Sequence, residues 1–158
     1  MNAIQRWSRG AVRAANGLQT PLLAAIRLYW GWQFAVTGWG KLHNLDRVTE
    51  FFTTLQLPMP AVTAVVVATV EFAGGLLLAA GLGTRAAALV LFTNMSVAYW
   101  VADRDAVMGF FSAPDKFYGA DPFPFWSVAL LLLVFGPGKW ALDRWLGPRL
   151  GAETEAAN

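Results

Sequence analysis

Cysteine is absent from this chain of 158 residues, and histidine occurs once, at His43. Without cysteine there is no disulfide framework, thiol relay, Cys-ligated metal or iron–sulfur cluster. A single histidine cannot supply both axial ligands of a haem b. The sequence also has no Walker loop, dinucleotide-binding glycine fingerprint, helical metal-ligand pair or nucleophile elbow. These absences exclude intrinsic thiol, haem and metal chemistry.

Charged residues are scarce as well. They make up 14% of the chain and hydrophobic residues 56%, whereas soluble domains have about 25% charged residues. Eight tryptophans and eleven phenylalanines are many for this length, and such rings suit the membrane–water interface. A soluble domain of this size is too small to enclose so much apolar surface. The composition therefore predicts an integral membrane protein with the lipid bilayer as its surroundings.

A dense run of Lys or Arg is also missing, although the net charge is +2 and the pI is near 9.3. The basic residues instead flank apolar stretches, which is a signal of membrane topology. Nucleic acid is therefore not an expected partner.

Four apolar stretches approach the roughly 20 residues that a helix needs to cross a bilayer. Pro21 suits the first turn of the first stretch, and Pro58 and Pro60 break the chain before the second. The predicted fold is an all-α integral membrane four-helix bundle with short interfacial helices, formed by residues 19–146. The predicted spans are 21–42, 61–82, 84–102 and 121–136.

The two ends of the chain differ from the predicted bundle. Residues 1–18 carry Arg6, Arg9 and Arg13 at helical spacing, which favours a basic amphipathic cytoplasmic segment as much as a frayed tail. Residues 147–158 are small and polar and are expected to form a flexible tail.

Lys and Arg are distributed unequally between the two sides of this predicted bundle. Seven flank the side with the N-terminus, the turn near 82–85 and the C-terminus, and four flank the other side. The positive-inside rule then places both termini in the cytoplasm of a multi-pass protein.

Two ionisable residues fall inside predicted spans. Glu71 would lie about 15 Å deep, near the middle of the bilayer, and Arg27 about 9 Å from the cytoplasmic edge. A charge at such depth is expected to have a partner. The two spans run in opposite directions, so the two depths are measured from opposite sides of the bilayer, and the residues differ in depth by only about 7 Å. An arginine side chain can cover that distance, so an Arg27–Glu71 ion pair is predicted. Such a pair either fixes helix packing alone or forms a site for a polar ligand, and spacing favours neither.

Further polar residues accompany this pair. Asn94 and Gln33 fall near mid-bilayer and complete the candidate intramembrane site, although an asparagine in a span more often bonds a neighbouring helix. Lys41 and His43 lie at the outer interface, where a lysine snorkels and a lone histidine is usually solvated. Neither is a metal ligand candidate.

Glycines follow a helical spacing in the first and second spans. Arg27, Gly31, Phe34, Gly38 and Lys41 are separated by four, three, four and three residues and form one stripe. We expect Gly31 and Gly38, with Gly74 and Gly75 beside Glu71, to let neighbouring helices approach closely.

These motifs together resemble the DoxX family over residues 20–146. The motifs are Arg27-x3-Gly31-x2-Phe34-x3-Gly38-x2-Lys41-Leu42, Glu71-x2-Gly74-Gly75-x2-Leu78-x2-Gly81 with Thr84-Arg85, and Gly136-Pro137-Gly138-Lys139-x3-Asp143. The resemblance implies a four-helix protein of the bacterial inner membrane. It also implies a link to quinol oxidases, thiosulfate:quinone oxidoreductases and oxidative-stress complexes, in which a direct thiol role does not suit a chain without cysteine.

Three functions remain in view. The first is an accessory subunit of a membrane redox system, in which an oxidoreductase component without its own redox group binds a quinone or docks other subunits. The second is a small transporter or lipid-handling protein, and the third a purely structural assembly subunit. Catalytic residues and substrate are left open, and so is a homo-oligomer.

Overall fold

The computed structural model describes residues 3–146, without side chains for 3–11, 13, 14, 145 and 146. This part of the chain is helical and contains no strand, so the predicted all-α class is confirmed for it. The C-terminal tail predicted for 147–158 lies outside the described residues, as do the side chains of the three arginines predicted to share a face in the N-terminal segment. The helices are α1 (Ala3–Leu42), α2 (Leu45–Thr54), α3 (Pro60–Ala80), α4 (Thr84–Ala102), α5 (Arg104–Met108), α6 (Pro114–Gly119), α7 (Pro122–Phe135) and α8 (Leu142–Leu146).

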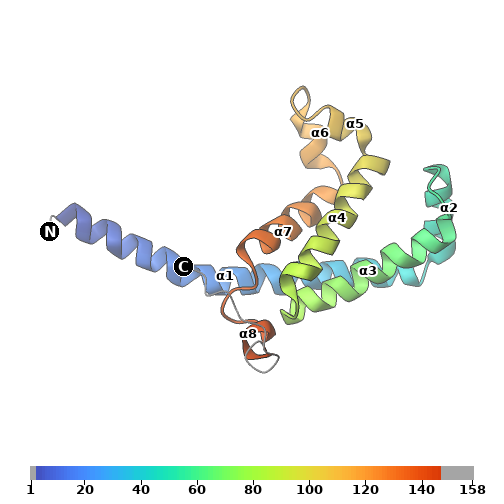
Figure 1. Ribbon diagram of the computed structural model, residues 1–158. Coiled ribbons are helices and arrows are strands. Elements are labelled where there is room, and N and C mark those ends of the chain that lie inside the picture. Colours follow the sequence, from blue (N-terminus) through green and yellow to red (C-terminus); the bar gives the residue numbers. More distant parts are fainter. Residues whose placement is uncertain (1–2, 147–158) are drawn as a thin grey trace.

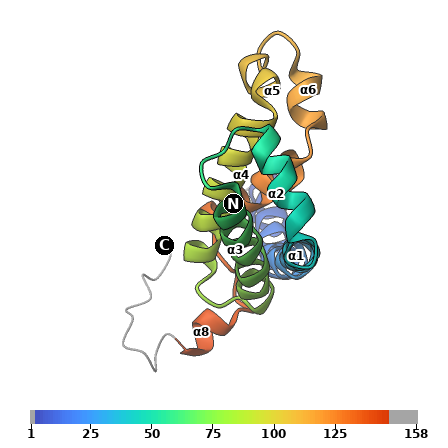
Figure 2. The ribbon, with the colours of Figure 1, turned by 90° about the vertical axis from the view of Figure 1, so that its right-hand side faces the viewer.

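The long helices form two antiparallel pairs. Helix α1 packs along α3, and α4 packs against α7, while α3 contacts α4 and so joins the pairs. Figures 1 and 2 show α5 and α6 as a head at one extremity of the molecule, with α8 at the opposite extremity. The first turns of α1 project beyond the other helices (Figure 1).

Glycines set the spacing and register of α1 and α3. A Cβ at Gly31 would lie 2.5 Å from the backbone nitrogen of Ala79, and a Cβ at Gly38 would meet the backbone of Phe72. Gly75 faces α1 in the same way, whereas Gly74 faces Leu91 of α4. The two backbones therefore approach more closely than any larger residue would allow.

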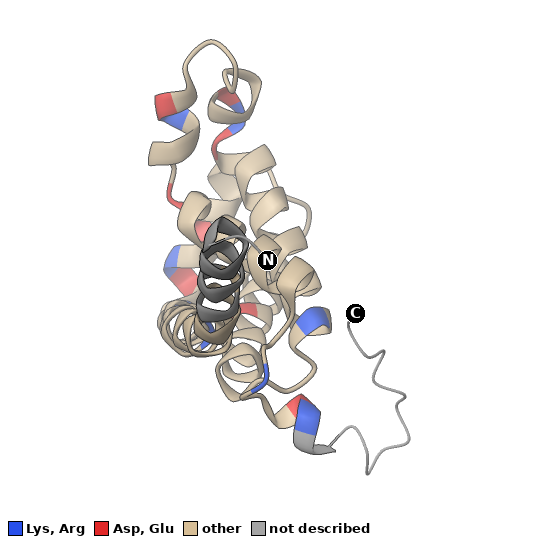
Figure 3. Ribbon diagram, turned by 90° about the vertical axis from the view of Figure 1, so that its left-hand side faces the viewer, with Lys and Arg blue, Asp and Glu red and all other residues tan. Residues whose placement is uncertain are grey.

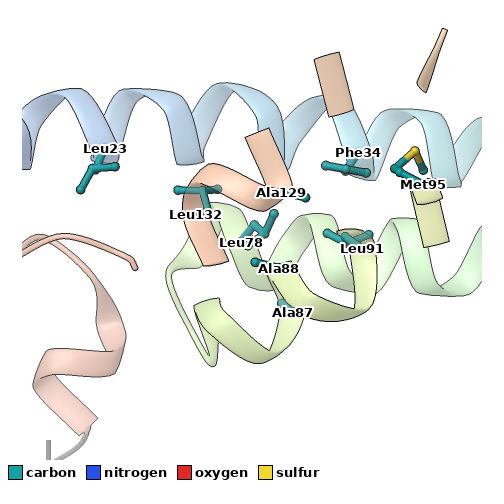
Figure 4. Packing of buried hydrophobic residues seen from close by; sticks show 9 residues of the cluster. All are labelled: Leu23, Phe34, Leu78, Ala87, Ala88, Leu91, Met95, Ala129 and Leu132. Carbon is teal, nitrogen blue, oxygen red and sulfur yellow. The ribbon is translucent and has the colours of Figure 1, made fainter. Parts of the chain in front are cut away.

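The apolar core lies where the two pairs meet. Leu78 of α3, Leu91 of α4 and Leu132 of α7 are fully buried there, together with Phe34 of α1. Figure 4 shows side chains of α3, α4 and α7 gathered beside α1. Because every long helix contributes, the core fixes the mutual placement of the elements that carry the polar residues.

Helix α1 corrects one prediction. Pro21 was expected in the first helical turn, but it lies inside a helix that runs without interruption from Ala3 to Leu42. A proline inside a helix removes a hydrogen bond and crowds the carbonyl four residues earlier. That residue is Gly17, where a Cβ would meet nothing within 4 Å, so the helix can adjust there without striking a neighbour.

The other boundaries follow local backbone chemistry. Helix α4 has the predicted bounds, and α7 is one residue shorter at each end than predicted. Helix α3 stops at Ala80, two residues earlier than predicted, because Gly81 takes the left-handed conformation with φ of 73°. Gly136 and Gly138 also have positive φ and turn the chain back after α7.

Apolar side chains cover much of the outer surface. Helices α3 and α4 are long and apolar enough to cross a membrane by length and composition, with mean hydropathies of 2.0 and 1.2, and α7 is apolar but shorter. Large apolar residues are exposed on all three, and on α1 as well, where Trp32 and Trp39 face outward. Water-soluble monomers rarely expose apolar surface on so many elements.

Candidate functional site

Glu71 lies at the centre of a polar cluster between α1, α3 and α4. Its side chain is only 1% exposed. Oε1 accepts two hydrogen bonds, from Lys41 Nζ of α1 at 2.6 Å and from Asn94 Nδ2 of α4 at 3.2 Å. Three helices that are distant in sequence thus each contribute one polar group to the same buried point.

The second carboxylate oxygen of Glu71 has no such partner. Oε2 is buried and accepts no hydrogen bond from the described residues. A buried acceptor left unsatisfied costs about 1–3 kcal/mol, so native proteins keep such groups where a water or ligand completes them. The Lys41 side chain is 30% exposed and therefore connects the cluster to the molecular surface. The arrangement suits a ligand that approaches beside Lys41 and donates a hydrogen bond to Oε2.

The predicted Arg27–Glu71 ion pair is wrong. Gly31 lies opposite the stretch from Gly75 to Ala79, so Arg27, one turn earlier in α1, lies beside Gly81 instead. Glu71 is ten residues before Gly81, which places it about 15 Å away along α3. The prediction from estimated depths failed because the glycine contacts, and not the predicted ends of the spans, set the register of α1 against α3.

Arg27 belongs to a second polar cluster at the α8 extremity. Its side chain is 3% exposed. Nη2 donates to the carbonyl of Trp140 at 2.8 Å and Nη1 to that of Pro137 at 3.3 Å, while Nε has no partner among the described residues. We call residues 136–144 the C-terminal clasp, because this segment folds back from α7 onto Arg27 of α1 and the turn between α3 and α4.

Asp143 fastens the clasp to the turn between α3 and α4. Its carboxylate accepts from Gly83 N at 2.5 Å and Thr84 N at 3.0 Å, and its backbone nitrogen donates to Gly81 O at 2.9 Å. It thereby caps the N-terminus of α4, where the backbone N–H groups lack partners within the helix. A larger residue at Gly81 would be strained, because φ is 73° and a Cβ would press on the guanidinium of Arg27 and on Ala141.

Sequence reasoning missed two parts of this arrangement, although signals for both were present. Lys41 follows Gly38 by three residues on one helical stripe, which predicts that it faces the neighbouring helix but not which residue it meets there. Asp143 closes the Gly136-Pro137-Gly138 motif, whose glycines turn the chain back toward α1.

The remaining predicted site residues do not join Glu71. The hydrogen bond at Gln33 uses its backbone carbonyl, which accepts from Thr37 Oγ1 of the same helix. The ring of the exposed His43 lies against Trp39, with Nδ1 at 2.9 Å from that residue's carbonyl. The structure therefore brings together Asn94 and Lys41, but not Gln33 or His43, with the carboxylate.

A cavity of about 590 Å³ lies elsewhere, at the junction of α4 with the α5–α6 head. It is lined by Asp103, Arg104 and Lys116 among others. Burial raises the pKa of Asp103 above its ordinary value, and the nearby charge of Asp121 raises it further. Neither Glu71 nor its partners line this cavity, and no group of three metal-ligating side chains occurs in the described part of the chain.

The helical fold, the two helices long and apolar enough to cross a membrane, and the polar cluster around Glu71 are typical of a small helical membrane protein. Residues 22–104 match the DoxX family, and they include Arg27, Lys41, Glu71 and Asn94. The chain belongs to this family. The inner membrane protein YphA of Escherichia coli (strain K12) is 29% identical over 156 residues, which cover 91% of this chain and 99% of YphA.

The predicted family membership is thus confirmed, and an inner-membrane location is supported by both comparisons. No solved structure matches the chain.

Proposed function

We propose that this DoxX-family protein is an accessory subunit of a membrane redox system, and that it binds the head group of a quinone-type molecule at Glu71. The unpartnered Oε2 of Glu71 is the observation that carries the proposal. The protein acts as a binding and docking component, and the electrons travel on the ligand and on partner subunits.

The hydrogen-bonding direction at Glu71 favours the reduced form of such a ligand. Lys41 and Asn94 both direct their donors at Oε1, so the remaining oxygen, Oε2, offers a ligand a hydrogen-bond acceptor. A hydroquinone hydroxyl donates a hydrogen bond, whereas a quinone carbonyl only accepts one. The site therefore favours hydroquinone over quinone.

The membrane arrangement of this proposal follows the predicted topology. Helices α1, α3, α4 and α7 cross the inner membrane, and the clasp and both termini lie on the cytoplasmic side. Arg85, Lys139 and Arg144 lie at the clasp end, in agreement with the positive-inside rule. The Glu71 site then lies within the bilayer, where an isoprenoid-tailed head group can reach it from the lipid.

Two other functions are less well supported. A transporter needs access to the buried carboxylate from both sides of the membrane, whereas the partly exposed Lys41 connects it to one surface. In a purely structural pair a buried water would have to donate to Oε2, and the hydroquinone titration below separates that function from ligand binding.

The test compares hydroquinone and quinone binding to purified protein in detergent micelles. Isothermal titration with a short-chain hydroquinone under anaerobic conditions, and with its quinone form, should give tighter binding of the hydroquinone. In Glu71→Gln the amide oxygen keeps Lys41 and Asn94 as donors, so the amide nitrogen replaces Oε2. Hydroquinone affinity should fall about tenfold or more, because a hydrogen bond to a charged group contributes about 1.5–3 kcal/mol, and quinone affinity should rise.

Glu50→Gln is the matched control, because it makes the same chemical change at an exposed residue of α2. It should bind both forms as the unaltered protein does. Unchanged hydroquinone binding in Glu71→Gln, or an equal loss in both variants, would refute the site.

A further inference from the structure

The clasp end of the molecule carries exposed positive charge from two parts of the sequence. Lys139 and Arg144 are exposed in the clasp, and Arg85 is exposed in the first turn of α4. Backbone contacts hold these segments together, because Asp143 binds the nitrogens of Gly83 and Thr84. In Figure 3, Lys and Arg positions gather at this extremity.

No ion pair joins these three basic side chains to an acidic one within the part of the chain that the structure describes. Asp143 is the only acidic residue in the segments 81–85 and 136–144. Both of its oxygens are already engaged by backbone N–H groups of the α4 N-terminus. The three exposed basic side chains are therefore available to an anion outside the protein.

Apolar side chains stand beside these charges. Trp140 is 65% exposed, and Leu142 and Leu82 are exposed as well. A tryptophan with neighbouring leucines and basic residues is typical of a segment at the membrane–water interface, where the rings enter the boundary and the cations meet head groups.

The opposite segments have the reverse charge balance. Residues 43–59 and 103–121, which form α2 and the α5–α6 head, contain six acidic residues and three basic ones. An anionic surface is therefore attracted to the clasp end and repelled by the head. The basic residues of the head are Arg104 and Lys116, and α2 adds Arg47.

We propose that the clasp end is a binding surface for anionic phospholipids. Arg85, Lys139 and Arg144 bind the phosphate groups of the lipid head groups, and Trp140 with Leu142 inserts at the boundary with the acyl chains. The clasp also binds Arg27 of α1 and the turn between α3 and α4. Lipid bound here therefore stabilises the packing of the clasp against these two elements. This surface is separate from the Glu71 site and does not depend on what that site binds.

The test is lipid retention measured by native mass spectrometry of protein purified in a neutral detergent. Phosphatidylglycerol should be retained in preference to phosphatidylcholine. The triple variant Arg85→Gln, Lys139→Gln, Arg144→Gln should lose this preference by at least tenfold, since each basic residue near an anionic surface adds to the attraction. The matched triple variant Arg47→Gln, Arg104→Gln, Lys116→Gln should keep it.

Two further arms make the result decisive. Millimolar inorganic phosphate should not displace phosphatidylglycerol; displacement would indicate a site for free anions and overturn the proposal. Should the first triple variant fail to fold, the double variant Lys139→Gln, Arg144→Gln keeps the Arg85 contact with Val134 and should lose most of the preference. Equal retention of both lipids by the unaltered protein, or equal loss in both triple variants, would also refute the surface.

Discussion

Helix α1 carries two buried polar clusters, and they differ in the kind of partner that satisfies the charge. Arg27 donates to two backbone carbonyls, those of Pro137 and Trp140. Glu71 instead accepts from two side chains, those of Lys41 and Asn94. The clusters lie about 21 Å apart along α1, measured from Arg27 to Lys41.

This difference separates a fixed contact from an exchangeable one. The Arg27 side chain is only 3% exposed and both of its acceptors are backbone carbonyls of the clasp, so it ties α1 to the clasp. The Lys41 side chain is long and partly exposed, and it can turn away from Glu71 through rotations alone. We therefore expect the Arg27 cluster to stabilise the fold and the Glu71 cluster to exchange hydrogen-bond partners more readily.

The largest expected effect comes from Arg27→Ala. The substitution removes the donors of two carbonyls and leaves a cavity beside Gly81, and each unsatisfied buried group costs about 1–3 kcal/mol. We expect the free energy of unfolding to fall by about 3 kcal/mol, measured by SDS-induced unfolding of protein in micelles. Arg27→Lys should recover part of the loss, because an ammonium reaches one carbonyl but cannot match the forked geometry of a guanidinium.

Arg47→Ala is the control for this comparison, because Arg47 is exposed on α2. It should change the free energy of unfolding by less than about 0.5 kcal/mol. Equal effects of Arg27→Ala and Arg47→Ala would show that the first cluster does not hold the clasp.

A smaller effect is expected from Asp143→Ala. The N–H groups of Gly83 and Thr84 lose their cap, and the loss of a helix cap costs about 1 kcal/mol. Hydrogen exchange of these two amides should become faster, while the amides in the middle of α4 keep their protection. Asp143→Asn keeps one carbonyl oxygen, so its exchange rates at Gly83 and Thr84 should lie between those of the unaltered protein and of Asp143→Ala. Unchanged exchange at both amides in Asp143→Ala would contradict the capping role.

The sequence alone predicts most of the helices, and the reasons are local. Thr84 and Ala102 bound α4 as predicted, because the glycine turn before it and the charged residues after it act within a few positions. The start of the first helix was predicted wrongly at Pro21, because proline is disfavoured inside a helix. Here the glycine four residues earlier leaves room for it.

The candidate site could be predicted only in part. Glu71 and Asn94 stood out because polar groups are costly in an apolar helix. The partner of Glu71 depends on the register of α1 against α3, which the contacts at Gly31 and Gly38 decide. Such contacts join residues far apart in the chain, and hydropathy does not report them. The capping role of Asp143 was not predicted for the same reason, because its partners are backbone groups about 60 residues away in the sequence.

Asn94→Ala gives the smallest expected effect and the sharpest test of the comparison. Asn94 donates one hydrogen bond to Glu71 Oε1, which keeps Lys41 as its second donor. Hydrogen bonds between membrane helices contribute about 0.6 kcal/mol on average, so the free energy of unfolding should fall by about that amount. Asn94→Asp, by contrast, sets a second carboxylate against Glu71 and should destabilise more strongly. A loss in Asn94→Ala as large as that in Arg27→Ala would mean that both clusters are fixed, and the case for an exchangeable site at Glu71 would fail.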